Sequence, residues 1–385
     1  MKASQLVFKS AVWVVGVTVL FAGLPAIAQP VPGLPPELII SGWLKPPFKS
    51  GSVSRGNLQV RELRAAQLEV LDAKTRIVTE AKRVFEQNSA IGLLLIEKDG
   101  SILFESYKRG ADQHSVMIGY SMSKSATSVA VGQALCDGVF TSLDDAAEKY
   151  SETLKGTAYG QATLQELLNL ASGGKKGEQA GQAVPGITSD ILRHQTRTIR
   201  SGFKEFGGGG ASAATRGELS YKNYDTYGLG VALADASKQP AYAYFSQAVW
   251  SRIGAQSDAA WLLDRNGDTS TAEGFGATLR DWGRFALYVR DQAAADNTSC
   301  LGNYLRQATS KRVSNNTQIL SHFRSYGNGF WADNYLVKSP SFWMTGYAGQ
   351  RIAVDPTSGR VLVLIANVED FMPEVYRLFD FWTRQ

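Results

Sequence analysis

A serine and a lysine stand three residues apart within residues 119–131, where a loop gives way to an apolar run. On a helix, residues at this spacing share a face, so the amine of Lys124 can reach the hydroxyl of Ser121. A serine hydroxyl becomes a good nucleophile when a neighbour takes its proton, and a partly desolvated lysine can do so because burial lowers its pKa. In the first helical turn, Ser121 would also lie near the positive end of the helix dipole, which favours developing negative charge. The pair therefore predicts nucleophilic catalysis.

The spacing alone is not specific, because Ser-x-x-Lys occurs three times in the chain. The other matches are Ser172/Lys175 and Ser201/Lys204. Both are interpreted as loops, where the spacing implies no shared face. Ser121 could also be an ordinary helix cap. Two further motifs later in the chain favour the catalytic interpretation.

The second motif is the Tyr-x-Asn triplet that begins at Tyr221. A phenol beside a lysine ammonium is shifted toward phenolate, so Tyr221 could take the proton of Ser121 and later return it to a leaving group. Asn223 carries both a donor and an acceptor with which to orient Lys124 and the substrate. Another triplet begins at Tyr326, so the pattern is not unique, and Tyr221 could simply pack at a helix start.

The third motif is Met344-Thr345-Gly346-Tyr347, just before the last predicted hairpin. Small residues there would let the backbone of an edge strand approach a bound substrate. Backbone N–H groups of Ser121 and Tyr347 could then form an oxyanion hole, in which each donor is typically worth about 3 kcal/mol. The alternative is a glycine-rich turn that leads into a strand.

Together the three motifs resemble those of the serine hydrolases related to class C β-lactamases, the broad group that includes the penicillin-binding proteins. Residues 167–173, 274–285 and 349–356 look like the esterase and amidase branch of that family, which includes the 6-aminohexanoate-dimer hydrolases. The resemblance covers roughly residues 80–385. It implies a sheet domain and a helical domain with the site between them.

The third motif departs from the family at one position. β-Lactamases and penicillin-binding proteins usually carry lysine, sometimes histidine, before Thr-Gly, where its charge helps to hold the substrate carboxylate; this chain has Met344. A thioether cannot supply that charge, which counts against recognition of β-lactams or D-Ala-D-Ala but not against cleavage of other amides or esters. Arg351 could substitute, although strand alternation could equally direct it to solvent.

A histidine-based triad is the main mechanistic alternative. Residues 119–123 nearly match the nucleophile elbow of α/β-hydrolases, with serine in place of the last glycine. The histidines are His114, His194 and His322, and only the last two follow Ser121 as the elbow's triad order requires. That fold also needs a parallel sheet, whereas the sequence predicts hairpins. Each histidine is interpreted as a solvated or hydrogen-bonded residue.

Hairpins near both ends of the chain define the predicted fold. Residues 91–96 and 102–107 flank a turn with Asp99-Gly100, and residues 351–356 and 361–366 flank another turn. Helical segments are expected over 58–88, from near 142, and over 163–170, 221–236, 241–253, 278–291 and from about 373. This order predicts an α+β fold like that of β-lactamases and penicillin-binding proteins, with one antiparallel sheet flanked by helices and an all-helical insert.

The first residues are typical of a secretory signal peptide. Residues 1–28 combine a basic start, an apolar run and the small-residue site Ala26-Ile27-Ala28. An uncleaved anchor is the alternative. The protein is therefore expected to be periplasmic or secreted. The remaining chain is divided into an extended arm at 29–56, a sheet domain at 57–135 and 270–385, and a helical domain at 136–269.

Charge and cysteine content limit which partners, disulfides and metal sites are expected. Removing residues 1–28 takes away two lysines and no acids, which lowers the formal net charge from +5 to +3. Without a dense Lys/Arg tract, nucleic acid is not expected as a partner, and a membrane is expected only through an uncleaved signal. Export would permit a disulfide between Cys136 and Cys300, while a buried free thiol at Cys136 is the alternative. No Cys/His spacing suggests a metal site.

The sequence thus predicts an exported serine hydrolase that cleaves a small amide or ester through an acyl-enzyme on Ser121, without a cofactor. The alternatives are a β-lactamase or DD-peptidase and, from another class, an inactive binding protein with the same fold. Intact Ser121, Lys124 and Tyr221 argue against the binding protein. The residues expected to bind or orient the substrate are Asn223, Thr345, Gly346 and Tyr347.

Overall fold

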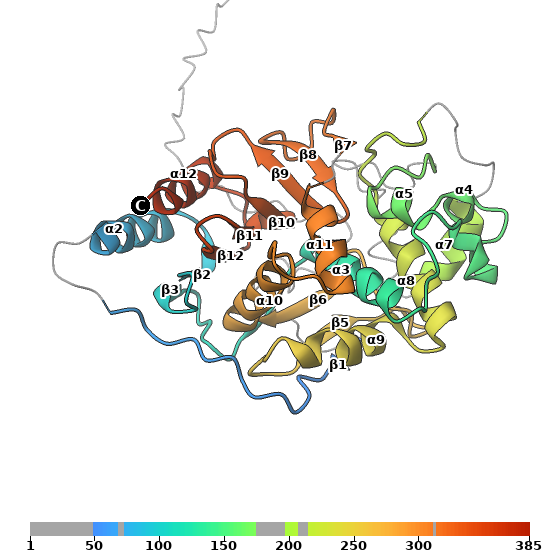
Figure 1. The fold of residues 1–385 in the computed structure, drawn as a ribbon, viewed down its shortest axis with the longest axis horizontal. Helices are drawn as coiled ribbons and strands as arrows, with labels where there is room; N and C mark the ends of the chain where they lie inside the picture. The colour runs from blue at the N-terminus through green and yellow to red at the C-terminus, as the bar shows by residue number, and fades with distance from the viewer. Residues whose placement is uncertain (1–48, 68–72, 175–196, 207–214, 311–312) are drawn as a thin grey trace, which may run out of the picture.

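Two antiparallel sheets and the helices around them make up the fold in the computed structural model (Figure 1). The model describes residues 49–67, 73–174, 197–206, 215–310 and 313–385. The predicted signal peptide, most of the predicted arm, Lys175 and His194 lie outside the described residues. Within these ranges, no helix combines the length and the apolar character needed to cross a membrane.

The larger sheet is assembled from both ends of the chain (Figure 1). Its strands are β2 (Ala90–Ile96), β3 (Ile102–Tyr107), β7 (Val313–Ser314), β8 (Phe323–Gly327), β9 (Phe330–Asn334), β10 (Phe342–Gly346), β11 (Gln350–Val354) and β12 (Val361–Ala366). They lie in the order β3-β2-β12-β11-β10-β9-β8-β7, and the two predicted hairpins are confirmed as β2–β3 and β11–β12.

Helices cover both faces of this sheet. They are α3 (Met122–Cys136) and α10 (Leu279–Gln292) on one face and α2 (Ala73–Gln87) and α12 (Met372–Thr383) on the other. In β12, Val361, Val363 and Ile365 pack on the α3 side, whereas Leu362 and Leu364 pack on the α12 side. Alternate side chains of a strand point to opposite faces, so a strand covered on both sides is apolar throughout.

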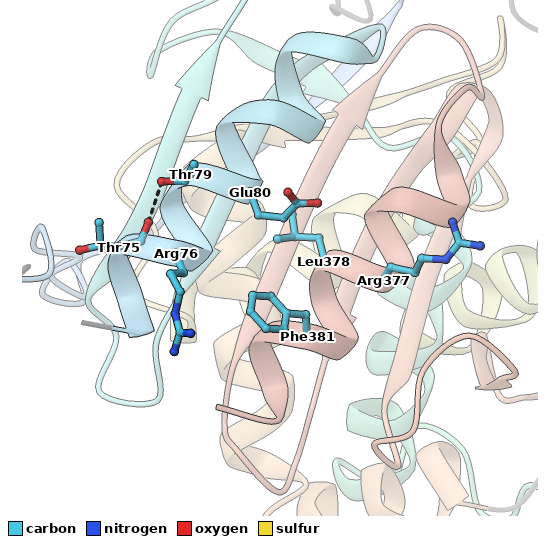
Figure 2. Close-up of a pocket in the computed structure, with 7 residues that line it drawn as sticks. All are labelled: Thr75, Arg76, Thr79, Glu80, Arg377, Leu378 and Phe381. Carbon is cyan, nitrogen blue, oxygen red and sulfur yellow. Dashed lines mark hydrogen bonds between the residues drawn. The ribbon is translucent and has the colours of Figure 1, made fainter. Parts of the chain in front are cut away.

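A pocket of about 480 Å³ lies between α2 and α12 (Figure 2). Its lining includes Leu378 and Phe381 from α12 and Thr75, Thr79 and Glu80 from α2. No residue of the three sequence motifs lines it, so this pocket is not the site that the motifs predict.

The sequence predicted one sheet, but the structure contains a second, smaller one. Its strands are β1 (Ser50–Val53), β4 (Val116–Ile118), β5 (Ala259–Leu262) and β6 (Phe275–Thr278), in the order β1-β5-β6-β4. Strands of three or four residues are too short to show a clear period of two, which is why the sequence did not reveal them. β5 also lies inside residues 136–269, which were expected to be all helical. The division of the chain into domains remains a prediction.

Of the remaining helices that the structure describes, three pack on α3, one of them also on the small sheet, and the other three pack against α8 (Asn223–Ser237). They are α4 (Ala158–Gln161), α5 (Leu164–Leu168), α7 (Ile199–Phe206), α8, α9 (Ala241–Ala248) and α11 (Cys300–Ser310), with short 3₁₀ helices at Ala147–Lys149, Glu152–Leu154, Trp250–Arg252 and Tyr347–Gly349.

Three predicted segments differ from these bounds. Residues 58–67 are not helical, because Ala65 pairs with Ile102 at the edge of the large sheet. The helix expected near residue 142 is only the 3₁₀ turn Ala147–Lys149, since the Ser142 hydroxyl accepts from the Asp144 N–H and closes a turn instead. Ser201 and Lys204 lie in α7, so their interpretation as a loop is wrong.

Helix α3 runs through the core and is buried over nearly its whole length. A disulfide joins Cys136 at its last residue to Cys300 at the start of α11, with the two Cα atoms 5.7 Å apart. The alternative of a buried free thiol at Cys136 is therefore wrong. The bond fixes the far end of the helix whose first turn carries Ser121.

Candidate active site

Ser121 lies at the turn from β4 into α3. The preceding residue, Tyr120, has a positive φ of 46°, a left-handed conformation that non-glycine residues rarely adopt. Ser121 occupies the N-cap position of α3, but its side chain makes no capping hydrogen bond. Ser121 thus stands at the cap position that the alternative interpretation expected, but its side chain does not cap the helix. Capping would have occupied the hydroxyl, whereas here the hydroxyl is in contact with Lys124.

Lys124 is almost completely buried and its Nζ has three oxygen neighbours. The amine donates to Ser121 Oγ at 3.1 Å, to Asn223 Oδ1 at 2.7 Å and to the carbonyl oxygen of Ala272 at 3.0 Å. The Ser-x-x-Lys spacing, one turn of α3, thus brings the amine to the hydroxyl as predicted. The contacts with Asn223 and Ala272 fix where the amine lies.

Asn223 is the first residue of α8 and lies between two groups of opposite character. Its Oδ1 accepts from Lys124, and its Nδ2 donates to Glu273 Oε2 at 3.0 Å. The second oxygen of Glu273 accepts from the Tyr227 hydroxyl at 2.6 Å. Sequence reasoning missed Glu273, because a single carboxylate 50 residues from its partner carries no recognisable spacing.

Tyr221 contacts Lys124 through the face of its ring. The Lys124 Nζ lies 4.9 Å from the ring centroid, and the ring stacks on Trp331 at 5.9 Å. Within the described part of the chain, no hydrogen bond joins the Tyr221 hydroxyl to Ser121 or Lys124. The structure therefore brings the phenol to the amine but does not place its hydroxyl on the Ser121 oxygen.

A buried ion pair holds the segment that carries Tyr221 and Asn223. Lys222, between them, points to Asp225, with 2.9 Å between Nζ and Oδ2 and side chains that are 1% and 0% exposed. Ser172 donates to the other oxygen of Asp225. Burial raises the pKa of Asp225, and the Lys222 charge opposes this rise. The pair fixes the first turn of α8.

The end of β10 approaches the chain just before Ser121. β9 pairs with β10 only at Phe342 and Trp343, so the last residues of β10 have no partner strand on that side. Gly346 lies there against Gly119, because a Cβ at Gly346 would come within 2.2 Å of the Gly119 carbonyl oxygen. Only glycine allows this approach to Gly119, while the expected approach of the strand to a bound substrate stays a prediction.

Tyr347 lies at this edge next to Tyr120, the residue that precedes Ser121. The ring of Tyr347 packs edge-on against the ring of Tyr120, with 5.9 Å between centroids. Tyr347 begins a short 3₁₀ helix and Ser121 occupies the N-cap position of α3, so the N–H group of each lacks an acceptor within its own helix. These are the two donors expected for an oxyanion hole.

The other residues of the third motif point away from this contact. Met344 is fully buried in the core on the α3 side. Thr345 pairs with Arg351 across β10 and β11, so both side chains lie on the opposite face. The Thr345 hydroxyl is buried and makes no hydrogen bond to any described residue. The structure thus gives no direct contact between Thr345 and Ser121.

Arg351 does not take the place of the missing lysine, and it is not exposed to solvent. Its side chain is fully buried and donates to Tyr376 Oη at 3.1 Å and to the carbonyl oxygens of Gly346 and Gln350 at 3.0 and 2.9 Å. It also pairs with Glu369. The suggestion that it points to solvent is wrong, and its donors are already engaged.

The histidines that the structure describes and the second Tyr-x-Asn triplet do not join this site. His114 is exposed, and His322 stacks on Tyr335 with centroids 5.4 Å apart. Neither has a described contact with Ser121, and both sheets are antiparallel, so the histidine-based triad gains no support. Tyr326, which begins the second Tyr-x-Asn triplet, is buried against Trp331.

Comparison with known proteins places this arrangement in a family. The model of the Beta-lactamase family matches residues 79–381. No curated protein sequence matches the chain.

Solved structures share the fold at low sequence identity. A Bacillus anthracis protein described as a 6-aminohexanoate-dimer hydrolase has a TM-score of 0.66 at 18% identity, over 88% of this chain and 90% of its own. EstCE1, a hydrolase with promiscuous acyltransferase activity, gives 0.63 at 13% identity over 80% and 97%. A class C beta-lactamase variant gives 0.61 at 14% identity over 83% and 100%. The chain therefore belongs to the beta-lactamase family and is a serine hydrolase.

Proposed function

We propose that this chain is an exported hydrolase that cleaves a small ester or linear amide through an acyl-enzyme on Ser121. The observation that carries the proposal is the contact of Lys124 Nζ with Ser121 Oγ at 3.1 Å, with the amine fixed by Asn223 and Ala272. A nucleophile and a base held by further groups is the arrangement that acyl transfer requires.

The proposed reaction has two stages. Ser121 Oγ bonds to the substrate carbonyl carbon while its proton passes to Lys124, and the resulting oxyanion accepts hydrogen bonds from the N–H groups of Ser121 and Tyr347. The intermediate then collapses, the C–O or C–N bond breaks, and the leaving group takes a proton supplied through Tyr221 and Lys124. Water attacks the acyl-enzyme by the same route in reverse order and frees Ser121.

The substrate class is argued from the cation that the third motif lacks. Met344 is apolar and buried, and Arg351 is engaged by Tyr376, Glu369 and backbone carbonyls. Neither offers a cation for a substrate carboxylate, which favours an ester or a linear amide over a β-lactam. The similarity to EstCE1 and to the Bacillus anthracis protein points the same way.

Export is supported by two independent features. Residues 1–28 have the pattern of a secretory signal peptide, and Cys136 is bonded to Cys300. Disulfides persist mainly in oxidising compartments, so both features agree with a periplasmic or secreted protein.

The proposal is tested by covalent labelling and a substrate panel. A fluorophosphonate probe should label the wild-type protein, and p-nitrophenyl esters or a linear anilide should be turned over faster than nitrocefin. Ser121→Ala should abolish labelling and turnover while the melting temperature changes little, because the side chain makes no capping bond. Ser201→Ala is the matched control, since Ser201 and Lys204 have the same spacing on α7.

Three results would contradict the proposal. Labelling of Ser121→Ala at the wild-type rate would place the nucleophile elsewhere. A folded wild-type protein that is neither labelled nor active would favour the binding-protein alternative. Preferential turnover of nitrocefin would instead favour the β-lactamase alternative.

A further inference from the structure

We propose that Glu273 is a positioning residue that holds the Asn223 amide, and through it the Lys124 amine, in the orientation that activates Ser121. Asn223 is the link between Glu273 and Lys124, because its amide contacts both side chains. This inference rests on the proposed function, because it concerns the same nucleophile and base.

An asparagine amide can present either its oxygen or its NH₂ group to a neighbour, so its orientation needs a cause. Lys124 requires an acceptor and lies 2.7 Å from Oδ1, whereas the Glu273 carboxylate requires a donor and lies 3.0 Å from Nδ2. These two demands agree on one orientation. Without the carboxylate, nothing in these contacts would prevent Asn223 from turning its NH₂ group toward Lys124.

The carboxylate is itself fixed from its other side. The Tyr227 hydroxyl donates to Oε1 at 2.6 Å, while Oε2 accepts from Asn223. Each oxygen thus has its own donor, and the side chain is 8% exposed. A buried carboxylate with both oxygens bonded is well suited to hold a neighbouring amide, because any rotation breaks one of two hydrogen bonds.

The negative charge of Glu273 acts on Lys124 as well. Helix α3 carries no other charged residue, Tyr221 faces Lys124 with its ring, and on α8 the Lys222 charge is compensated by Asp225. The turn between β8 and β9 presents Gly329 to the backbone of Lys124. Burial, with smaller contributions from Tyr347 and Glu273, raises the pKa of the Tyr120 phenol, so this phenol stays neutral and adds no charge.

Replacing Glu273 should therefore have two separable effects. In Glu273→Gln the side chain keeps its shape but offers one acceptor oxygen to two donors, so the Asn223 orientation is weakened. The same variant removes a negative charge from the surroundings of the amine, so the rise of the reaction rate with pH should shift to lower pH. Glu273→Ala removes both oxygens and should disturb the Asn223 orientation more.

The test measures the rate of fluorophosphonate reaction with Ser121 as a function of pH, in the full-length protein. Wild type should show a rate that rises with pH to a plateau. Glu273→Gln and Glu273→Ala should lower the plateau rate about 10- to 100-fold. In Glu273→Gln the midpoint of the rise should also move to lower pH by about one unit.

Glu97→Gln is the matched control. Glu97 is also 8% exposed and also has two partners, Arg360 and Trp382, but it lies at the end of β2 away from the motifs. Its plateau rate and midpoint should equal those of wild type, even if its melting temperature falls.

The outcomes separate this inference from the proposed function. Failure of the wild-type protein to react at Ser121 would refute the function. Reaction of wild type together with unchanged plateau and midpoint in Glu273→Gln would refute only the role of Glu273. A lower melting temperature of that variant with both quantities unchanged would show a structural role and also overturn the inference; if Glu273→Ala fails to fold, Glu273→Gln still decides.

Discussion

Lys124 has three oxygen neighbours, whereas a neutral amine has only two hydrogen atoms. Two of these neighbours, Asn223 Oδ1 and the Ala272 carbonyl, can only accept, so they engage both hydrogens of the neutral form. Its lone pair is then left for the third neighbour, the Ser121 hydroxyl. We therefore expect Lys124 to be the direct base, whereas Tyr221 contacts the amine through its ring.

The Tyr221 hydroxyl is therefore expected to matter most when a leaving group must be protonated. Tyr221→Phe keeps the ring against Lys124 and Trp331 but removes the proton donor. We expect kcat to fall about 100-fold or more for a linear anilide. For a p-nitrophenyl ester the fall should be much smaller, because p-nitrophenolate leaves without a proton. Steady-state kinetics on both substrates measures the ratio.

Tyr326→Phe is the control for this prediction. Tyr326 packs against the same Trp331, with ring centroids 4.9 Å apart, and loses the same atom. It should leave the ratio of anilide to ester turnover unchanged. An equal loss on both substrates in Tyr221→Phe would assign the hydroxyl to attack by Ser121 instead of departure of the leaving group.

The residues found from the sequence are those that belong to a short, recognisable spacing. Ser121 and Lys124 are linked by helical spacing, and Asn223 belongs to a short motif. Glu273 and Tyr120 could not be found in this way. Glu273 contacts Asn223 across 50 residues of sequence. Tyr120 matters because of its backbone φ of 46°, which cannot be predicted from the residue type. Backbone strain of this kind costs about 1–3 kcal/mol and is retained where the surroundings enforce it.

At the scale of elements, hairpins were predictable and packing directions were not. The Asp99-Gly100 turn and the apolar runs of β2, β11 and β12 are local signals. The burial of Arg351 depends on which face of β11 meets Tyr376 of α12, which no local pattern states. The short strands of the small sheet depend likewise on partners far along the chain, such as β1 on β5.

One pair of elements is joined by an ion pair whose strength should depend on pH. Arg280 of α10 donates to both oxygens of Glu105 on β3, at 2.7 and 2.6 Å, and Tyr107 donates at 2.6 Å. Burial alone would raise the pKa of Glu105, but these hydrogen bonds and the Arg280 charge hold it below its ordinary value of 4.5. A carboxyl whose pKa is lower in the folded than in the unfolded state stabilises the fold at pH values above the unfolded-state pKa. This stabilisation is lost as the pH falls through the folded-state pKa.

Glu105→Gln should therefore lower the free energy of unfolding by about 1–3 kcal/mol at pH 7. The difference from wild type should begin to shrink as the pH falls below the ordinary glutamate pKa of 4.5 and should keep shrinking until Glu105 is protonated in the folded wild type as well. Urea titrations at several pH values measure it, with the exposed Glu152→Gln as the control. A difference that persists unchanged at low pH would attribute the loss to packing instead of charge.

For the whole molecule, the disulfide links the fold to its proposed compartment. Cys136 and Cys300 are 164 residues apart and are the only cysteines in the chain. Closing so long a loop restricts the unfolded chain strongly, and loss of a native disulfide typically costs about 2–5 kcal/mol. A protein that depends on this bond should fold better after export than in a reducing cytosol.

The double variant Cys136→Ser/Cys300→Ser should melt about 5–10 °C below the oxidised wild type. Its kcat at 25 °C should stay near wild type, because Cys136 lies at the last residue of α3 and Ser121 precedes the first, about 20 Å away along the helix axis. Reduced wild type should have the same melting temperature as the variant, and reductant should not change the melting temperature of the variant. Equal melting of oxidised wild type and variant would show that the bond adds no stability, and the argument from the disulfide to an oxidising compartment would then fail.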